Sequence, residues 1–386
     1  MLDSLRPAAT RLPTSGIIEV FAYGRTRPGL IPLWAGEGDL PTPSFICEAA
    51  TKALTAGETF YTYQAGLPSL RDSLARYHRR HYDRSFASDE FFVTGSGMQA
   101  IMLALQCVAG ADDTIVTPSP AWPNFAGAAV AMGAALRSVP MRLTAGGWQL
   151  DCDALFAAVD ATTRAIVVNS PSNPTGWTAS RDELRAILHF ARQRGLWIVA
   201  DEIYGRFHYA GGVAPSFQDL RQPGDRILFV NTFSKMWAMT GWRIGWLQAP
   251  AELGPTIENL VQYNTSGVAP FMQHAATAAL EEGESFAISQ IERAARGRDI
   301  VCNALAPFNS VRFTPPPGAF YLFFAIDGLD DARTAAFRLV DEANIGLAPG
   351  TAFGPGGERY FRICFLRSPA PLEEAMHRIT HWLQRR

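Results

Sequence analysis

The chain has 386 residues, of which 48% are hydrophobic and 18% are charged, and its formal net charge is −2. This is the composition of a globular protein long enough for two domains. It has no basic excess that would bind nucleic acid or an anionic membrane.

The five cysteines are scattered and form no C-x-x-C pair, so neither a disulfide framework nor a metal site is expected. The first residues lack the apolar core of a signal peptide, and no run of about 18 apolar residues predicts a membrane span. A reduced, cytoplasmic location therefore fits best.

Residues 1–44 are rich in proline and glycine and predict an arm with one short helix near 17–23. Two helices are expected next, over 44–55 and 69–82, and Ser44 is expected to be the N-cap of the first.

From residue 91 to 248, short apolar runs alternate with helical patterns. Strands are expected at 91–94, 114–117, 135–139, 165–169, 196–200, 227–231 and 243–247, and helices at 99–108, 122–131, 152–159 and 180–194. Most of the runs are apolar throughout, which indicates a doubly wound α/β sheet covered on both faces.

Residues 251–306 have helical patterns, and 284–305 could be one long helix joining two domains. Strands are expected at 319–325 and 360–365, and helices at 332–343 and 371–383. The expected division is an arm and part of the small domain over 1–44, a large domain over 45–290, and a small C-terminal domain over 291–386.

The segment from Thr232 to Gly245 contains Lys235, behind a strand-like run, and Arg243. Lysine amines form Schiff bases with carbonyl compounds, including pyridoxal phosphate. A nearby arginine is suited to a phosphate because its planar fork bonds two oxygens. A solvated loop lysine is the alternative, and the apolar neighbours Phe233 and Met236 argue against it.

The sequence Gly95-Ser96-Gly97-Met98-Gln99-Ala100 lies between an expected strand and an expected helix. Free backbone N–H groups at a helix N-terminus attract phosphate. The segment also matches the dinucleotide pattern G-x-G-x-x-A, but Asp112 and Asp113 lie before the next strand rather than at its end. A phosphate site is favoured, and a plain tight turn remains an alternative.

Asp201 follows a buried apolar strand, where a carboxylate is costly unless it is paired. A cation such as a protonated ring nitrogen is one partner, and a helix N-cap role is the alternative. Arg362 stands among apolar residues in an expected strand, which suggests a bidentate carboxylate site. The solvent side of an edge strand is the other interpretation.

The run S-K-x-x-A-M-T-G-W-R-x-G over 234–245 resembles the cofactor-lysine signature of the class I and II aminotransferases, fold type I of the pyridoxal phosphate enzymes. Tyr61–Gly66, Asn169–Gly176 and Ala200–Tyr204 carry further elements of that aspartate aminotransferase-like pattern, which covers nearly the whole chain. The resemblance implies a three-layer α/β/α large domain with a mostly parallel sheet, and a smaller α+β domain from the two chain ends.

The resemblance also implies a pyridoxal 5′-phosphate-dependent aminotransferase that moves an amino group from an L-amino acid to a 2-oxo acid by a ping-pong mechanism. In that interpretation Lys235, Asp201 and Tyr204 are catalytic, and Gly36, Trp122, Asn173 and Arg362 bind the substrate. The implied cofactor-binding residues are Ser96, Gly97, Met98, Trp122, Asn173, Asp201, Tyr204, Ser234, Lys235, Arg243 and Tyr61.

Tyr61 is similar to the tyrosine that reaches the cofactor phosphate of the neighbouring subunit, so a homodimer with shared active sites is expected. Tyr263, Asn264 and Ser266 are expected near that interface. Alternatives are a pyridoxal phosphate-dependent lyase, decarboxylase or cyclase, a cofactor-binding regulator without enzyme activity, and a nicotinamide oxidoreductase.

The residues near the expected site also bear on the choice of amino donor. Some aspartate-using relatives carry a lysine in the region where Met98 stands. Together with Trp122, Phe125, Ile17 and Phe21, Met98 favours a neutral or aromatic donor.

Overall fold

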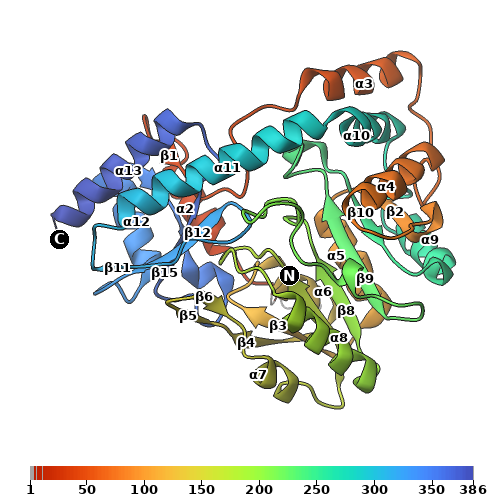
Figure 1. The fold of residues 1–386 in the computed structure, drawn as a ribbon, viewed down its shortest axis with the longest axis horizontal. Helices are drawn as coiled ribbons and strands as arrows, with labels where there is room; N and C mark the ends of the chain where they lie inside the picture. Colours follow the sequence, from red (N-terminus) through yellow and green to blue (C-terminus); the bar gives the residue numbers. More distant parts are fainter. Residues whose placement is uncertain (1–3, 6, 11, 386) are drawn as a thin grey trace.

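The structure, a computed structural model, describes residues 4–385 apart from 6 and 11, and it is built on a seven-stranded sheet (Figure 1). The strands lie in the order β2 (Phe91–Thr94), β10 (Gly245–Gln248), β9 (Ile227–Thr232), β8 (Trp197–Asp201), β7 (Thr163–Asn169), β3 (Thr114–Ser119) and β4 (Ala135–Pro140). Strand β10 is antiparallel to both of its neighbours, and the pairs from β9 to β4 are parallel.

Successive residues of the central strands face two separate cores. Ile166 and Ile198 pack into one hydrophobic cluster with helix α8 (Arg181–Arg194), whereas Val167 and Val199 pack into the other with helix α5 (Gly97–Val108). Runs that are apolar throughout are therefore what a sheet covered on both faces requires, and the expected three-layer α/β/α arrangement is confirmed.

The other helices of the large part of the protein are α1 (Pro7–Thr10), α3 (Ser44–Thr55), α4 (Pro68–His81), α6 (Asn124–Met132), α7 (Cys152–Ala157), α9 (Gly254–Gln262) and α10 (Pro270–Glu282). Helix α2 (Gly16–Gly24) instead packs against the smaller part. A short hairpin of β5 (Arg142–Thr144) and β6 (Gly147–Gln149) was not expected from the sequence.

A second, four-stranded antiparallel sheet belongs to the smaller α+β part. Its order is β11 (Val311–Arg312), β12 (Tyr321–Ile326), β15 (Tyr360–Cys364) and β14 (Ala348–Pro349). The helices α11 (Glu284–Leu305), α12 (Ala332–Ala343) and α13 (Pro369–Gln384) pack with it, and α11 runs from α10 across to α13 (Figure 1). Near the N-terminus, β1 (Ile31–Pro32) pairs with β13 (Ile345–Gly346), so both chain ends build this part.

Several local predictions were wrong. Ser44 is the first residue of α3 rather than its cap; Pro43 holds the cap position and makes no side-chain bond there. Arg243 does not belong to a strand, because the short 3-10 turn Thr240–Trp242 ends there in the left-handed region with φ 53°. The strand starts at Gly245, so the predicted start at Arg243 was two residues too early.

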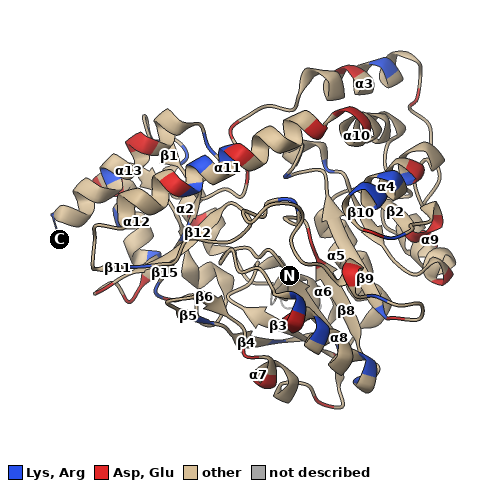
Figure 2. Cartoon of the chain, in the orientation of Figure 1, with Lys and Arg blue, Asp and Glu red and all other residues tan. Residues whose placement is uncertain are grey.

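Charges of both signs are spread over the helices, for example along α11 (Figure 2), in keeping with the small net charge of −2. None of the helices within the described residues combines the length and the apolar character that crossing a bilayer requires.

Candidate active site

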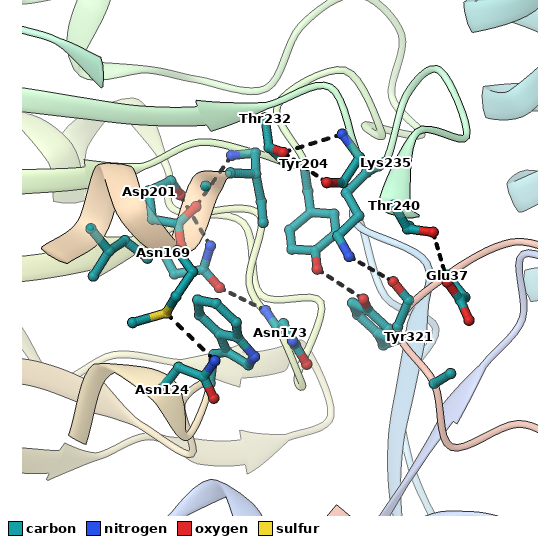
Figure 3. Close-up of a pocket in the computed structure, with 18 of the residues that line it drawn as sticks. Glu37, Asn124, Asn169, Asn173, Asp201, Tyr204, Thr232, Lys235, Thr240 and Tyr321 are labelled. Atoms are coloured by element: carbon teal, nitrogen blue, oxygen red, sulfur yellow. Dashed lines mark hydrogen bonds between the residues drawn. The ribbon is translucent and has the colours of Figure 1, made fainter. Parts of the chain in front are cut away.

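The carboxyl ends of three neighbouring strands open into one cavity of about 490 Å³. Strand β7 ends at Asn169, β8 at Asp201 and β9 at Thr232, and Asn169 lies opposite Asp201 in the register of the sheet. Ligands of open α/β sheets bind at the carboxyl edge of the strands. The topology thus brings together side chains that are far apart in the sequence (Figure 3).

Asp201 is a buried carboxylate, with only 1% of its surface exposed. Burial raises its pKa to about 7, and the bond from the Ile203 backbone N–H (3.3 Å) together with the charge of Lys235 offsets only part of this. Because a buried anion is costly without a partner, the site has a place for a cation next to Asp201. It is not a helix cap: Asp201 is the last residue of a strand.

Lys235 projects into the same cavity from the turn that follows β9. Its Nζ donates to the Gly36 carbonyl oxygen at 2.8 Å, and burial lowers its pKa to about 8. An amine with a lowered pKa is more often neutral at physiological pH, and a neutral amine can attack a carbonyl carbon.

The N-terminus of α5 provides the cavity with free amides. The first helical bond is donated by Ala100 to the Ser96 carbonyl oxygen, so the Gly97 and Met98 amides precede it. The Ser96 hydroxyl accepts from the Gln99 amide at 3.0 Å and caps the helix. These amides and the positive end of the helix dipole suit a phosphate.

Glycine at 245 allows this helix end to approach the lysine turn. A Cβ there would lie 2.7 Å from the Asn231 carbonyl oxygen and 2.9 Å from the Gly97 amide nitrogen. Close by, the Thr232 and Ser234 hydroxyls lie 2.9 Å apart, and Arg243 lines the same end of the cavity. Hydroxyls, amides and a guanidinium are a donor set for an oxyanion.

Arg362 is 3% exposed and enters from the small sheet, where β15 has a neighbour on each side. The edge-strand interpretation is therefore wrong. Its Nη1 donates to Asn173 Oδ1 at 2.9 Å and its Nη2 donates to the Trp34 carbonyl oxygen, whereas its Nε has no partner. Each terminal nitrogen keeps a second N–H, which leaves a fork for a carboxylate.

Most residues singled out from the sequence line this one cavity. They are Gly36, Gly97, Met98, Trp122, Asn173, Asp201, Tyr204, Ser234, Lys235, Arg243 and Arg362. Ser96, the N-cap of α5, does not line the cavity itself but directly precedes Gly97, which does. Tyr61 is 94% exposed and does not line the cavity. Ile17 lines it too, but Phe125 is buried in the core and Phe21 packs against Trp34.

Sequence reasoning missed about half of the wall. The additional lining residues are Trp34, Ala35, Glu37, Ile101, Asn124, Asn169, Ile203, Val230, Thr232, Thr240 and Tyr321. Asn169 and Thr232 could have been found, because each ends a predicted strand. Tyr321 had no such signal, since it reaches the cavity from the other sheet.

The donor set fits an aromatic aldehyde phosphate. It holds an amine for the aldehyde, a buried carboxyl group with one backbone donor for a ring nitrogen, and amides, hydroxyls and an arginine for the phosphate. The fold and this site define a fold type I pyridoxal phosphate enzyme.

Comparison with known proteins agrees with the site. The family model of class I and II aminotransferases matches residues 28–379. The chain is 32% identical over 373 residues to an aspartate aminotransferase of Pyrococcus horikoshii, covering 96% of this chain and 95% of the relative. It is also 32% identical over 370 residues to aromatic-amino-acid aminotransferase 2 of Thermococcus litoralis, covering 95% and 94%.

Solved structures with a similar fold are aminotransferases as well. The aspartate aminotransferase of Thermotoga maritima superposes with a TM-score of 0.91 at 29% identity, covering 98% of this chain and 100% of that one. An aromatic aminotransferase from Pyrococcus horikoshii has a TM-score of 0.87 at 30% identity, covering 96% and 99%. The chain therefore belongs to the class I and II aminotransferases, which are pyridoxal 5′-phosphate-dependent enzymes.

Proposed function

We propose that this cavity transfers the amino group of an L-amino acid with one carboxylate to a 2-oxo acid, with Lys235 as the residue that carries the proton. The observation on which this rests is the position of Lys235. Its amine lies in one cavity with the buried Asp201 and with Arg362, whose guanidinium keeps a fork for a carboxylate.

When bound, pyridoxal 5′-phosphate supplies an aldehyde for Lys235 and an electron-withdrawing ring. Asp201 would hold a proton on the ring nitrogen, and Tyr204 and Asn173 would bind the phenolic oxygen. The Gly97 and Met98 amides, Ser234 and Arg243 would bind the phosphate, and Trp122 would cover the ring face.

Arg362 orients the donor by its α-carboxylate beside Gly36. As a free amine, Lys235 would take a proton from the donor Cα and give it to the neighbouring C4′ carbon of the cofactor. The first 2-oxo acid leaves before the second binds, so the two half-reactions share a single site.

The cavity favours a donor with a neutral side chain. Its cations are Lys235, Arg243 and Arg362, and each has a role in holding cofactor or α-carboxylate. At the remaining wall stand Met98 and Ile17, together with the carboxylate of Glu37, which accepts from the Thr240 hydroxyl at 2.8 Å. If the donor carried a carboxylate in its side chain, that carboxylate would find no further cation among the described residues that line the cavity.

We propose a homodimer that completes each cavity. Phe60, Tyr61, Tyr63 and Tyr263 are 81, 94, 63 and 89% exposed. Their two segments are joined by a bond from Gln64 Nε2 to Gln262 Oε1 (2.7 Å). Exposed apolar patches mark interfaces.

The patch borders the phosphate end, since Gln99 in the first turn of α5 donates to Asn264 Oδ1 at 2.7 Å. In a two-fold dimer the same patch meets its copy, which would place Tyr61 near the partner's phosphate. The five unpaired cysteines accord with a cytoplasmic location.

The chain contains two lysines, Lys52 and Lys235, so a labelling experiment can assign the cofactor to one of them. The protein is reconstituted with pyridoxal 5′-phosphate, reduced with borohydride and digested, and the labelled peptide is mapped by mass spectrometry. We expect the label on Lys235, its retention in Lys52→Arg and its loss in Lys235→Ala. A label found on Lys52 alone, or none, would overturn the proposal.

Steady-state kinetics with neutral, aromatic and acidic donors against pyruvate and 2-oxoglutarate test the reaction itself. Parallel double-reciprocal lines and faster turnover of the neutral donors are expected. Release of ammonia from a donor without any 2-oxo acid would instead identify a lyase.

A further inference from the structure

Tyr321, which was not predicted from the sequence, lines the candidate site. It is the first residue of β12, is fully buried (0% exposed) and lines the cavity. Its hydroxyl lies 2.8 Å from the Tyr204 hydroxyl, and either oxygen could be the donor (Figure 3).

The ring of Tyr321 also supports Arg362. The guanidinium carbon lies 4.6 Å from the Tyr321 ring centroid and 5.0 Å from that of Phe353. In the small sheet Tyr321 pairs with Cys364 and Phe323 pairs with Arg362, so Tyr321 and Arg362 are diagonal neighbours on one face. A buried cation over aromatic faces is held in place by their negative quadrupoles.

A third contact joins Tyr321 to the segment that holds the lysine. A Cβ on Gly36 would lie 2.6 Å from the Tyr321 hydroxyl oxygen, and the Gly36 carbonyl accepts from Lys235 at 2.8 Å. A side chain at residue 36 would therefore force Tyr321 or the Gly36 backbone to shift. Tyr321 therefore lies against three residues with expected roles: Tyr204 for the phenolic oxygen of the cofactor, Gly36 for the amino donor, and Arg362 for the carboxylate of that donor.

The two hydroxyls share one hydrogen bond but have two protons. Burial raises the pKa of both Tyr204 and Tyr321, so both remain protonated at physiological pH. If Tyr321 donates to Tyr204, the Tyr204 proton is free to point at an acceptor in the cavity; in the opposite arrangement it is used up.

We propose that Tyr321 is a positioning residue of this active site: its hydroxyl donates to the Tyr204 oxygen and thereby directs the Tyr204 proton into the cavity, while its ring holds the Arg362 fork. The inference rests on the proposed function, in which Tyr204 donates to the phenolic oxygen of the cofactor. It adds that this donation depends on a second tyrosine from the other sheet.

Tyr321→Phe separates the two roles, because it removes the hydroxyl and keeps the ring. The reconstituted enzyme is titrated with pH while the absorbance of the bound cofactor is recorded. Loss of one hydrogen bond to the group that stabilises the phenolate should raise the midpoint by about one pH unit. The KM for the donor should stay within about twofold, since the ring still supports Arg362.

Two variants serve as comparisons. Tyr209→Phe removes a partly buried hydroxyl, which donates to the Ala319 carbonyl at 2.5 Å outside the cavity wall, and should leave the midpoint unchanged. Tyr321→Leu removes ring and hydroxyl together, and should raise the donor KM by roughly tenfold in addition to the midpoint shift.

The double variant Tyr204→Phe/Tyr321→Phe decides whether Tyr321 acts through Tyr204. Once Tyr204 has no hydroxyl, the loss of the Tyr321 hydroxyl should add nothing to the midpoint shift. An additive shift, or an unchanged midpoint in the single Tyr321→Phe variant, overturns the inference.

Borohydride labelling of Lys235 in the same preparations keeps this result separate from the proposed function. Label on Lys235 with an unmoved midpoint removes only the role of Tyr321. Absence of the label from the unmutated protein removes the proposed function itself.

Discussion

The adjacent residues Asp201 and Glu202 both have buried carboxyl groups, and their hydrogen-bond partners differ. Burial raises the pKa of Asp201 to about 7 and that of Glu202 to about 8. Glu202 already accepts from the Ser216 hydroxyl (2.6 Å) and the Phe217 amide (3.2 Å) on the other side of the strand. Asp201 points into the cavity with a single backbone donor, so it is the one left for a ligand.

This difference predicts how the cofactor-free protein responds to pH. The folded pKa of Asp201, about 7, exceeds the unfolded value of 3.8, so the folded state keeps a proton that the unfolded state has lost. Its contribution is fully present below pH 3.8 and is lost as pH rises through about 7.

In urea unfolding, Asp201→Asn should therefore lose less stability between pH 5 and 7 than the unmutated protein, by about 2 kcal/mol. Part of the slope will remain because Glu202 titrates in the same direction. An equal slope in both proteins would contradict the assignment of a protonated Asp201.

Arg362→Lys tests the carboxylate fork. A lysine keeps the charge but not the two parallel N–H donors, so the donor KM should rise by roughly 10- to 100-fold. Arg367→Lys is the matched control, since Arg367 donates to the Pro32 carbonyl at 3.1 Å and does not line the cavity. Equal effects of the two changes would remove Arg362 from the substrate site.

At the scale of elements, the site depends on how closely α5 approaches β9 and β10. Glycine at 245 makes that approach possible, because the Asn231 carbonyl and the Gly97 amide crowd the place of a Cβ. The position of the α5 N-terminus, which would hold the phosphate, thus depends on Gly245 at the start of strand β10.

Gly245→Ala should push the first turn of α5 away from the lysine turn and weaken pyridoxal 5′-phosphate binding by about tenfold or more, measured as Kd by fluorescence titration. Gly241→Ala is the control in the same segment, since a Cβ there meets nothing within 4 Å. Similar Kd values for the two variants would show that the approach of α5 is not needed.

At the scale of the whole molecule, the cavity lies between two sheets and beside an exposed aromatic patch. The large sheet contributes Asp201 and, through the turn after β9, Lys235, and the small sheet contributes Tyr321 and Arg362. The division at residue 290 falls inside α11 and stays a prediction, as do the roles assigned to the individual site residues.

The proposed dimer predicts a dependence of activity on protein concentration. Tyr263→Asp places a charge in the aromatic patch and should shift sedimentation velocity profiles toward the monomer, with activity per chain falling on dilution. Ile288→Asp, at a residue on α11 that is 47% exposed, should leave both unchanged. A fully active monomer would refute a shared site.

The sequence by itself determined the class of the fold and the chemistry. Apolar runs alternating with helical patterns predicted the order and type of nearly all strands and helices, because burial on both faces leaves that pattern in any sequence. Lys235 and Asp201 follow apolar strands, whose carboxyl ends meet at one edge of a parallel sheet, and the resemblance to the family added Asn173 and Arg243; all four line the cavity.

Only the tertiary structure decided the rest. Turn geometry fixed the left-handed Arg243, because a local conformation of that kind is imposed by the contacts around it rather than by residue type. The segment after β8 pairs with the segment before β12 through the bridge between His208 and Gly318, and this brings Tyr321 to Tyr204 across 117 positions of sequence. No local pattern encodes such a contact, because the free energy that sets it comes from burying residues of both parts of the chain in one hydrophobic core.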